Sequence, residues 1–262
     1  MSYNPDNYWS DVAEKIQKRG GSYVAGDDNP YNRHKRRKFL QTFLDRMNFN
    51  DLVVLEVGCG PGGNLRRIIT QHAPSRLLGV DVSQKMFELA GSNLSSFNKV
   101  ELKKTDGTVI PFPDQSVDLA FTVTVLQHVS DERMFRSLIS EMCRVTRGTI
   151  ILMEDIGSTG EIQGEGSFVG RKIAVYRDAL AQHGFELQKF RFLNTRVSRA
   201  LYQRAYYWHQ RLTTRKRQEG ESAPLPVWLC SAAAMPITRI LDNVVPERFD
   251  LAQMEFRRTG TT

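Results

Sequence analysis

Short apolar runs alternate with stretches of helical periodicity along the middle of the chain. The apolar runs, which predict buried strands, begin at residues 53, 76, 100, 116, 149 and 185, and a last one covers 253–258. Helical patterns lie between them, from residue 65 onward and over 84–94, about 131–146 and 176–183. Strands that alternate with helices of roughly 10–15 residues favour parallel pairing with right-handed crossovers. The pattern therefore predicts an α/β core over residues 51–194.

The two ends of the chain are less regular than this core. Residues 1–50 include a helical pattern over 31–44, and we expect this segment to fold over a ligand as a lid. Tyr8, Trp9 and Tyr31 are candidates to touch that ligand, and plain packing is an equal alternative. Residues 195–248 are expected to form helices beside the active site, and 249–262 to hold the last strand and a tail. The apolar stretch 225–237 is expected to be a buried helix rather than a membrane anchor, although surface association is conceivable.

Residues Val53–Asn64 carry the strongest signal for ligand binding. An apolar run ends on an acid, breaks into the glycines Gly58, Gly60 and Gly62, and resumes as a helix. Glycines let a ligand approach the backbone, and the N–H groups at a helix start can face that ligand. Such a loop is suited to a nucleotide-like molecule at the carboxyl end of a sheet.

Glu56 discriminates between two nucleotide-like ligands for this loop. Gly58, Gly60 and Gly63 satisfy the spacing of a dinucleotide-binding loop, so NAD is one alternative. A carboxylate beside a diphosphate would repel it, whereas the ammonium of an amino acid would be attracted. Glu56 therefore favours S-adenosylmethionine over NAD, and a structural turn without a ligand is the third alternative.

Two further acids follow predicted strands. Asp81 lies at the end of the second strand, near the spacing of about 20 residues expected for an acid that binds ribose hydroxyls. Asp106 could accept a hydrogen bond from an adenine amino group, with Gly107 allowing close approach and Ile110 and Phe112 as apolar walls. Both acids also fit a simpler role as turn or cap formers.

Four motifs in this order resemble the class I S-adenosylmethionine-dependent methyltransferases that act on small molecules and glycans. They are Leu-Glu-Val-Gly-Cys-Gly-Pro-Gly, Gly-Val-Asp-Val-Ser, Asp-Gly-Thr-Val-Ile-Pro-Phe-Pro-Asp and Val-Asp-Leu-Ala-Phe…Val-Leu-Gln-His-Val, within residues 50–190. The resemblance implies a Rossmann-like, doubly wound sheet of seven mostly parallel strands, with the last strand inserted antiparallel between its two predecessors.

The resemblance also assigns expected roles to residues of these motifs. Glu56, Gly58, Cys59 and Gly60 should line the methionine end of the cofactor, Asp81 and Val82 the ribose, and Asp106 with Gly107 the adenine. Thr122 or Thr124 should approach the methionine portion. Many relatives carry Glu-His where this chain has Gln127-His128, so a base or metal role for that glutamate does not transfer.

Composition and charge limit the remaining possibilities. The chain has a net charge of +7, and residues 196–217 combine seven arginines and lysines with four aromatic residues. A solvated face, an anionic acceptor and RNA are the three alternatives for this insertion. Three distant cysteines suggest neither a disulfide framework nor a metal site. No run is long enough to span a bilayer and the start lacks a secretory pattern, so we expect a cytoplasmic protein.

The candidate chemistry is methyl transfer to oxygen on a small molecule or glycan. His128 follows the fourth strand and is the first candidate for a general base, because its ordinary pKa lies near neutrality. Glu154, and Asp155 beside it, end the fifth strand and are alternatives, and transfer by proximity without a base is another. An RNA methyltransferase, a non-catalytic binder of S-adenosylmethionine and an NAD-dependent oxidoreductase are the alternative functions.

Overall fold

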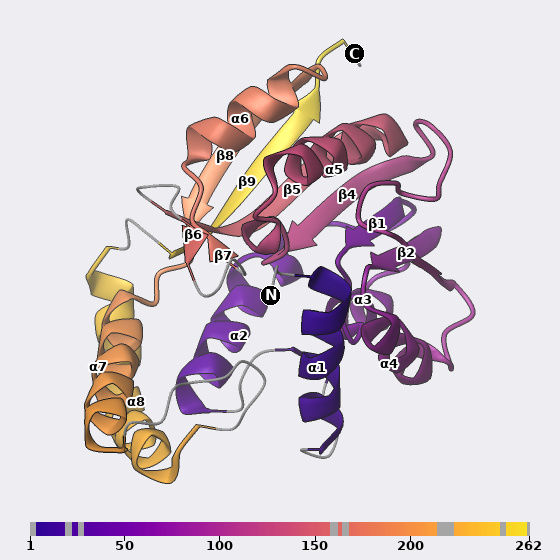
Figure 1. Ribbon diagram of the computed structural model, residues 1–262. Helices are drawn as coiled ribbons and strands as arrows, with labels where there is room; N and C mark the ends of the chain where they lie inside the picture. The colour runs from indigo at the N-terminus through magenta and orange to yellow at the C-terminus, as the bar shows by residue number, and fades with distance from the viewer. Residues whose placement is uncertain are drawn as a thin grey trace.

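A twisted seven-stranded sheet with helices on both faces forms the centre of the molecule (Figure 1). The computed structural model describes residues 4–18, 23–25, 29–157, 162–163, 168–213, 223–246 and 250–260. The strand order is β3-β2-β1-β4-β5-β9-β8. Strands β1 to β5 pair in parallel, and β9 pairs antiparallel with both β5 and β8. The expected fold class is confirmed, including the position of the last strand.

The bounds of the elements agree with the predicted pattern within a few residues. The strands of the sheet are β1 (Val53–Val57), β2 (Arg76–Asp81), β3 (Val100–Lys104), β4 (Val117–Val123), β5 (Thr146–Ile156), β8 (Phe185–Phe192) and β9 (Asp250–Arg258). The helices are α1 (Pro5–Lys18), α2 (Pro30–Thr42), α3 (Gly63–Gln71), α4 (Gln84–Leu94), α5 (Glu132–Val145), α6 (Ile173–Ala181), α7 (Arg196–Thr213) and α8 (Leu225–Val244). Two short 3-10 turns, η1 (Leu44–Arg46) and η2 (Leu126–His128), complete the core.

Side chains from both faces of the sheet form two hydrophobic clusters. One cluster packs α5 and α6 against the sheet, with Phe135 and Tyr176 among its largest members. The other packs the helices before and after β1 against the opposite face, through residues such as Phe43 and Ile68. Because both faces are covered, the central strands are apolar on both sides, as expected of a parallel sheet. This double coverage leaves the carboxyl edge of the sheet as the place for a ligand.

Polar caps fix where the helices next to this edge begin. The Ser83 side chain accepts a hydrogen bond from the Met86 N–H at the start of α4, and Asp131 accepts one from Met134 at the start of α5. Asn29 caps α2 in the same way, and Pro30 occupies its first turn. Such caps satisfy N–H groups that have no partner inside the helix.

The fifth strand runs one residue beyond its predicted end, and a short second sheet follows it. Strand β5 continues to Ile156, and β6 (Ile162–Gln163) pairs antiparallel with β7 (Phe168–Val169). Both Glu154 and Asp155 therefore belong to β5. Residues Arg215, Lys216 and Arg217 of the basic insertion lie outside the described residues.

The ends of the chain pack on the core as helices. Helix α1 lies against α4, and α7 and α8 pack on each other beside α2 (Figure 1). Residues 225–237 form a helix as expected, but the expectation that it is buried is wrong for one face, because Leu225, Leu229 and Ile237 of α8 are exposed. Among the described helices, none is both long and apolar enough to cross a membrane.

Candidate active site

The loop after β1 lies at the carboxyl edge of the sheet and is fastened to β2. The N–H groups of Gly58 and Cys59 both donate to the Val80 carbonyl, over 2.8 and 3.0 Å. The N–H of Gly60 donates to Oδ2 of Asp81 over 2.8 Å. These bonds hold the loop in one conformation before any ligand binds.

The glycines of this loop serve different purposes. Gly58 has a φ of +72°, and an added Cβ would clash with the Val125 side chain. Gly60 has a φ of +51°, and nothing lies within 4 Å of the place where its Cβ would be. Packing and backbone conformation therefore explain Gly58, whereas Gly60 opens onto free space that a ligand can approach.

Glu56 is buried beside this loop with one oxygen available. Its Oε1 accepts a hydrogen bond from Asn64 Nδ2 over 2.6 Å, and Asn64 Oδ1 accepts one from Arg36 over 2.6 Å. Its Oε2 is buried and has no hydrogen-bond partner among the described residues. Burial raises the pKa of Glu56 to about 8, although the bond from Asn64 and the charge of Arg36 lower it. A cation that reached Oε2 would satisfy this oxygen and favour its charged form.

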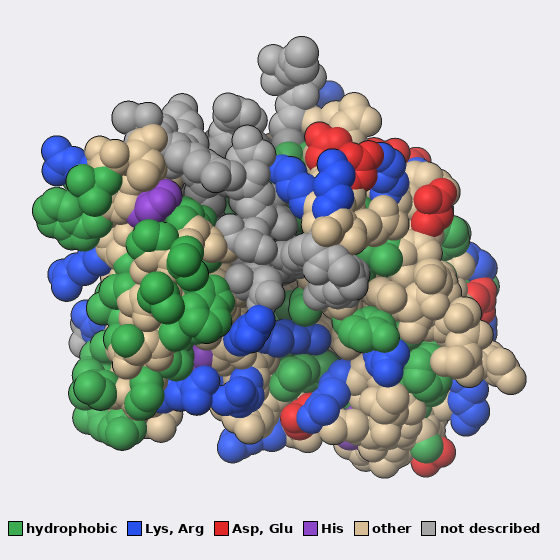
Figure 2. Space-filling view, turned by 90° about the horizontal axis from the view of Figure 1, so that it is seen from below, with side chains coloured by type: hydrophobic (Ala, Val, Ile, Leu, Met, Phe, Trp, Pro, Cys, Tyr) green, Lys and Arg blue, Asp and Glu red, His purple; other side chains and the backbone are tan. Residues whose placement is uncertain are grey.

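Glu56 and the glycine loop line a cavity of about 750 Å³. One wall comes from Glu56 and residues 58–61 and 63–64, and the other from α2. The wall on α2 includes four cations, Arg33, Lys35, Arg36 and Arg37, beside Asn32, Phe39 and Leu40. Figure 2 shows Lys and Arg side chains gathered along the middle of the lower face of the molecule. The cavity is large enough for a small-molecule ligand.

Asp81 is buried at the end of β2, where it organises the backbone. Its Oδ1 accepts a hydrogen bond from the Ser83 N–H over 2.9 Å, while Oδ2 receives the bond from Gly60. Burial raises the pKa of Asp81, and its backbone hydrogen bonds lower it in part. Val82, the next residue, lies close to Gly107, since an added Cβ on Gly107 would be 3.7 Å from it. The structure thus brings together the residues expected at the ribose and the adenine.

Helix α1 covers this part of the edge. Asp6 accepts a hydrogen bond from the Gln84 N–H over 3.1 Å, and the hydroxyl of Ser10 lies 3.0 Å from that of Ser83. Trp9 packs edge-on against His128, with ring centroids 4.9 Å apart. Tyr31, in contrast, stacks on Tyr202 of α7 and is buried. Of the aromatic residues expected on the lid, Trp9 thus lies beside the candidate base and Tyr31 serves packing.

Asp106 is exposed and shapes its own turn. Its Oδ1 accepts hydrogen bonds from the N–H and hydroxyl of Thr108 and from the N–H of Val109. The bonds from Thr108 lower its pKa. Ile110 and Phe112 are buried in the core cluster of α5, so the expectation that they wall an adenine site is not supported.

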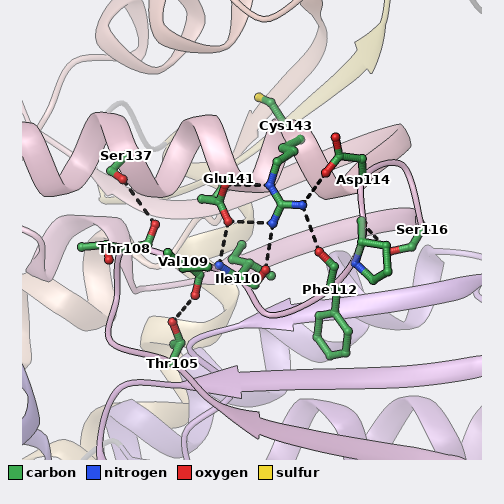
Figure 3. Close-up of polar contacts among 12 residues, drawn as sticks. Thr105, Thr108, Val109, Ile110, Phe112, Asp114, Ser116, Ser137, Glu141 and Cys143 are labelled. Carbon is green, nitrogen blue, oxygen red and sulfur yellow. Dashed lines mark hydrogen bonds and ion pairs between the residues drawn. The ribbon is translucent and has the colours of Figure 1, made fainter.

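Helix α5 fastens the loop that carries Asp106 and Gly107 (Figure 3). Arg144 donates to the carbonyls of Ile110 and Phe112 and pairs with Glu141 and Asp114. Glu141 accepts a hydrogen bond from the Ile110 N–H over 2.8 Å. These polar contacts, together with the burial of Ile110 and Phe112, hold the loop between β3 and β4 in place.

Thr122 and Glu154 form a buried pair at the ends of β4 and β5. The Thr122 hydroxyl donates to Glu154 Oε1 over 2.6 Å, and the N–H groups of Val125 and Gln127 donate to the same carboxylate. Burial raises the pKa of Glu154 to about 7, and these bonds lower it in part. Because both oxygens are occupied, the geometry favours a bracing role for Glu154 over the predicted catalytic one. Thr124, rather than Thr122, lines the cavity.

Arg171 braces the same turn from the other side. This buried guanidinium donates to the carbonyls of Leu126 and Val129 over 2.8 and 2.7 Å. Carboxylate and guanidinium together satisfy the backbone of the turn that carries Gln127 and His128. The turn is therefore preorganised.

His128 keeps its position as a candidate base. It is half-buried between Trp9 and Phe168, and its Nε2 lies 3.3 Å from Gln127 Nε2. Gln127 in turn contacts Asp155, which pairs with Lys35 of α2 over 3.6 Å. The predicted catalytic role remains a prediction, as do the cofactor roles of the residues above.

Cys59 lies in the wall of the cavity but is not activated. Burial raises the pKa of its thiol well above the ordinary value, and the charges of Asp81 and Glu56 act in the same direction. A thiol of this kind is neutral and unreactive.

Arg36 and Asn64 belong to the site but carried no signal in the sequence. Asn64 follows the glycines and could have been considered as a polar residue at the start of a helix. Arg36 sits in the basic run 33–38, where nothing distinguishes it from its neighbours. Its burial, which lowers its pKa to about 10, separates it from the solvated cations.

Residues 54–148 match a family described as "Methyltransferase domain". The core of the chain is a class I S-adenosylmethionine-dependent methyltransferase domain. Over 82 residues this chain is 33% identical to a demethylmenaquinone methyltransferase of Tropheryma whipplei, and over 107 residues it is 32% identical to the O-methyltransferase rstn1 of Aspergillus nomiae. These stretches cover 31% and 39% of this chain and 33% and 46% of those proteins. The chain thus spans less than half the length of either.

The fold of this methyltransferase domain extends beyond the matched residues. Magnesium protoporphyrin IX methyltransferase from Synechocystis PCC 6803, solved with bound S-adenosylhomocysteine, superposes with a TM-score of 0.62 at 14% identity. The superposition covers 97% of this chain and 98% of that one. At this identity the likeness shows a shared fold and no more.

The residues of the methyltransferase domain fit its cofactor, S-adenosylmethionine. The unsatisfied Glu56 oxygen suits the ammonium of the methionine portion, and the nearby Arg36 suits its carboxylate. Gly60 leaves free space at the loop, and Asp81, Val82 and Gly107 are the residues predicted to contact the nucleoside. The predicted family and cofactor are confirmed.

Proposed function

We propose that the protein methylates an oxygen of a small-molecule or glycan acceptor that carries a negative charge. The observation that carries this proposal is the cavity, which has the glycine loop on one side and the cationic wall of α2 on the other. S-adenosylmethionine supplies an activated methyl group when it is bound. The acceptor's anionic group would contact Arg33 and Arg37, whose guanidinium groups are suited to carboxylate or phosphate.

The residues around η2 orient the acceptor in this proposal. The hydrogen bonds from Arg171 and those to Glu154 fix the turn. They thereby position Thr124, which follows β4, and His128, which ends η2. His128 would accept the proton of the acceptor hydroxyl, while Trp9 excludes water from one side of its ring. All three cysteines are free thiols, as is usual for proteins of the cytoplasm, where we place the reaction.

The test is to incubate the protein with cell extract and S-adenosylmethionine that carries an isotopic label on its methyl group. We expect labelled product among the compounds retained by an anion exchanger, with the label on oxygen. Label confined to neutral or cationic compounds would contradict the anionic acceptor. Label on RNA would favour the predicted alternative of an RNA methyltransferase.

Substitutions test whether Arg33 and Arg37 bind the acceptor and whether His128 is the general base. Arg33→Met with Arg37→Met is expected to raise KM for the acceptor about tenfold and leave kcat within about twofold, since a charged contact contributes roughly 1–3 kcal/mol. Arg177→Met on the outside of α6 is the matched control, because Arg177 is an exposed cation far along the chain from the cavity and paired with Asp178. His128→Ala should lower kcat about a hundredfold if His128 is the base, and an unchanged kcat would remove it from that role.

A further inference from the structure

Helix α8 exposes an almost wholly apolar face and buries most of its polar residues. Its buried face carries Ser231, Thr238 and Asp242 beside the apolar Val227 and Met235. Its exposed face carries only one polar residue, Asn243, and is otherwise apolar: Leu225, Pro226, Leu229, Cys230, Ala233, Pro236, Ile237, Ile240, Leu241 and Val244. A surface helix of a globular protein normally shows the reverse.

The exposed apolar side chains of α8 are large and strongly exposed. Leu229, Ile237, Ile240 and Val244 are 54%, 66%, 67% and 72% exposed. They recur at helical spacing, so they form one continuous stripe along a helix of 20 residues, roughly 30 Å long. A continuous apolar patch of this kind marks an interaction site.

The buried face of α8 explains why this orientation is fixed. Asp242 accepts hydrogen bonds from the N–H groups of Val197 and Ser198 at the start of α7, and its Oδ2 lies 3.0 Å from His34 of α2. Burial tends to raise the pKa of Asp242, but the bonds from His34 and Ser198 lower it below the ordinary value. Rotating α8 to bury its apolar stripe would break these bonds and leave the carboxylate unpaired inside the protein, which is costly.

Helix α7 adds aromatic and cationic side chains to the same hairpin. Tyr207, Trp208 and Leu212 are exposed toward its end, and so are Arg204 and Arg211 nearby in the chain. The guanidinium of Arg211 lies over the ring of Tyr207, 5.5 Å from its centroid. Exposed aromatic residues beside arginines are typical of surfaces that meet the headgroup region of a bilayer.

The exposed charged side chains in the described part of the α7–α8 hairpin are all positive. Among residues 196–213 and 223–246 the basic residues are Arg196, Arg199, Arg204, Arg211 and Arg239, and the acidic one is the buried Asp242. In Figure 2 hydrophobic side chains gather on the side where α7 and α8 lie, with Lys and Arg beside them, and Asp and Glu appear elsewhere. This charge decides between two occupants of the stripe. A second copy would bring the same arginines together, whereas an anionic lipid surface would attract them.

We infer that the outer face of the α7–α8 hairpin docks on an anionic lipid bilayer. The apolar stripe of α8 enters the boundary between headgroups and acyl chains, and the arginines of α7 contact lipid phosphates. Because α2 lies between α8 and the cavity, docking holds the cavity beside the membrane surface. The inference does not depend on which acceptor is methylated.

The test is co-sedimentation of the full chain with vesicles made of equal parts phosphatidylglycerol and phosphatidylcholine. We expect binding that weakens as salt is raised and that is about tenfold weaker on pure phosphatidylcholine. Ile237→Gln with Ile240→Gln should weaken binding about tenfold or more, since both changes remove apolar area from the stripe. Arg204→Gln with Arg211→Gln should reduce the salt dependence.

Phe190→Gln is the matched control, because Phe190 is 51% exposed on β8, outside the hairpin. It should leave vesicle binding unchanged, and circular dichroism should show that every variant keeps the fold. Absence of vesicle binding, or equal binding by the Ile237→Gln, Ile240→Gln variant, would overturn the inference. A wild-type dimer that dissociates in that variant, seen by sedimentation velocity without lipid, would overturn it in favour of a second copy.

Discussion

Glu56 on β1 and Glu154 on β5 are both fully buried at the carboxyl edge of one sheet, yet their surroundings differ. Burial raises the pKa of both, to about 8 and about 7. Glu154 receives hydrogen bonds from Thr122 and two backbone N–H groups, whereas Glu56 keeps one oxygen without a partner among the described residues. The difference teaches that a raised pKa alone does not mark a ligand site; the unsatisfied oxygen beside a cavity does.

The largest expected effect comes from removing the bonded carboxylate. Glu154→Leu would leave the Thr122 hydroxyl and the N–H groups of Val125 and Gln127 buried without an acceptor. We expect the free energy of unfolding to fall by about 4 kcal/mol, measured by urea denaturation. Glu154→Gln, which keeps one acceptor oxygen, should lose less. A loss below about 1 kcal/mol for the leucine variant would show that Glu154 does not brace the turn.

Replacing the Glu56 carboxylate should raise the free energy of unfolding, whereas replacing that of Glu154 should lower it. Its folded pKa of about 8 lies above the unfolded value of about 4.3, so the folded state holds a proton that the unfolded state has released. The contribution of Glu56 to the stability of the ligand-free protein is therefore greatest below about pH 4 and is lost as the pH rises to about 8. Glutamine does not ionise, so Glu56→Gln removes the loss of stability that Glu56 causes as the pH rises. We expect the ligand-free variant to be more stable than the wild type by about 2 kcal/mol at pH 8, measured by urea denaturation at several pH values. A variant that is less stable than the wild type at pH 8 would contradict the comparison.

A smaller effect is expected at Asp81, which is hydrogen-bonded like Glu154 and is predicted to contact the cofactor like Glu56. Asp81 is also buried like Glu154, and it is predicted to contact the nucleoside of the cofactor. Asp81→Ala should weaken binding of S-adenosylmethionine by roughly 1–3 kcal/mol, measured by calorimetry, through loss of ribose contacts and of the bond to Gly60.

Asp118→Ala is the control for the Asp81 variant. Asp118 also accepts a backbone hydrogen bond, from the Val53 N–H over 2.8 Å. It lies near the amino end of β4, at the edge of the sheet opposite to Asp81. It should leave cofactor affinity unchanged. Equal affinity in the Asp81 variant and the wild type would remove Asp81 from the cofactor site.

The sequence predicted the core well because local pattern and buried position agree there. The run from Val53 is apolar on both faces, and Ser83 caps a helix at its predicted start. The place of the last strand came from the family resemblance. The glycine loop and Glu56 were found for the same reason, since their chemistry depends on neighbours in the chain.

The parts that the sequence did not predict depend on contacts between distant segments. Arg36 reaches Glu56 through Asn64, and nothing near Arg36 in the chain reports this. The exposure of α8 follows from Asp242 meeting His34 and Ser198, so its apolar composition alone pointed to the wrong face. Ile110 and Phe112 likewise turned to the core because α5 packs there.

The central claim is that Glu56 holds the ammonium of the methyl donor, and a comparison of two ligands tests it most directly. Calorimetry should measure the affinity of the wild type and of Glu56→Gln for S-adenosylmethionine and for 5′-methylthioadenosine, which lacks the amino-acid end. We predict that the substitution weakens S-adenosylmethionine about tenfold or more and leaves 5′-methylthioadenosine within about twofold, since a hydrogen bond to a charged group contributes roughly 1.5–3 kcal/mol. Equal loss for both ligands, or a wild type that binds NAD and not S-adenosylmethionine, would contradict the account.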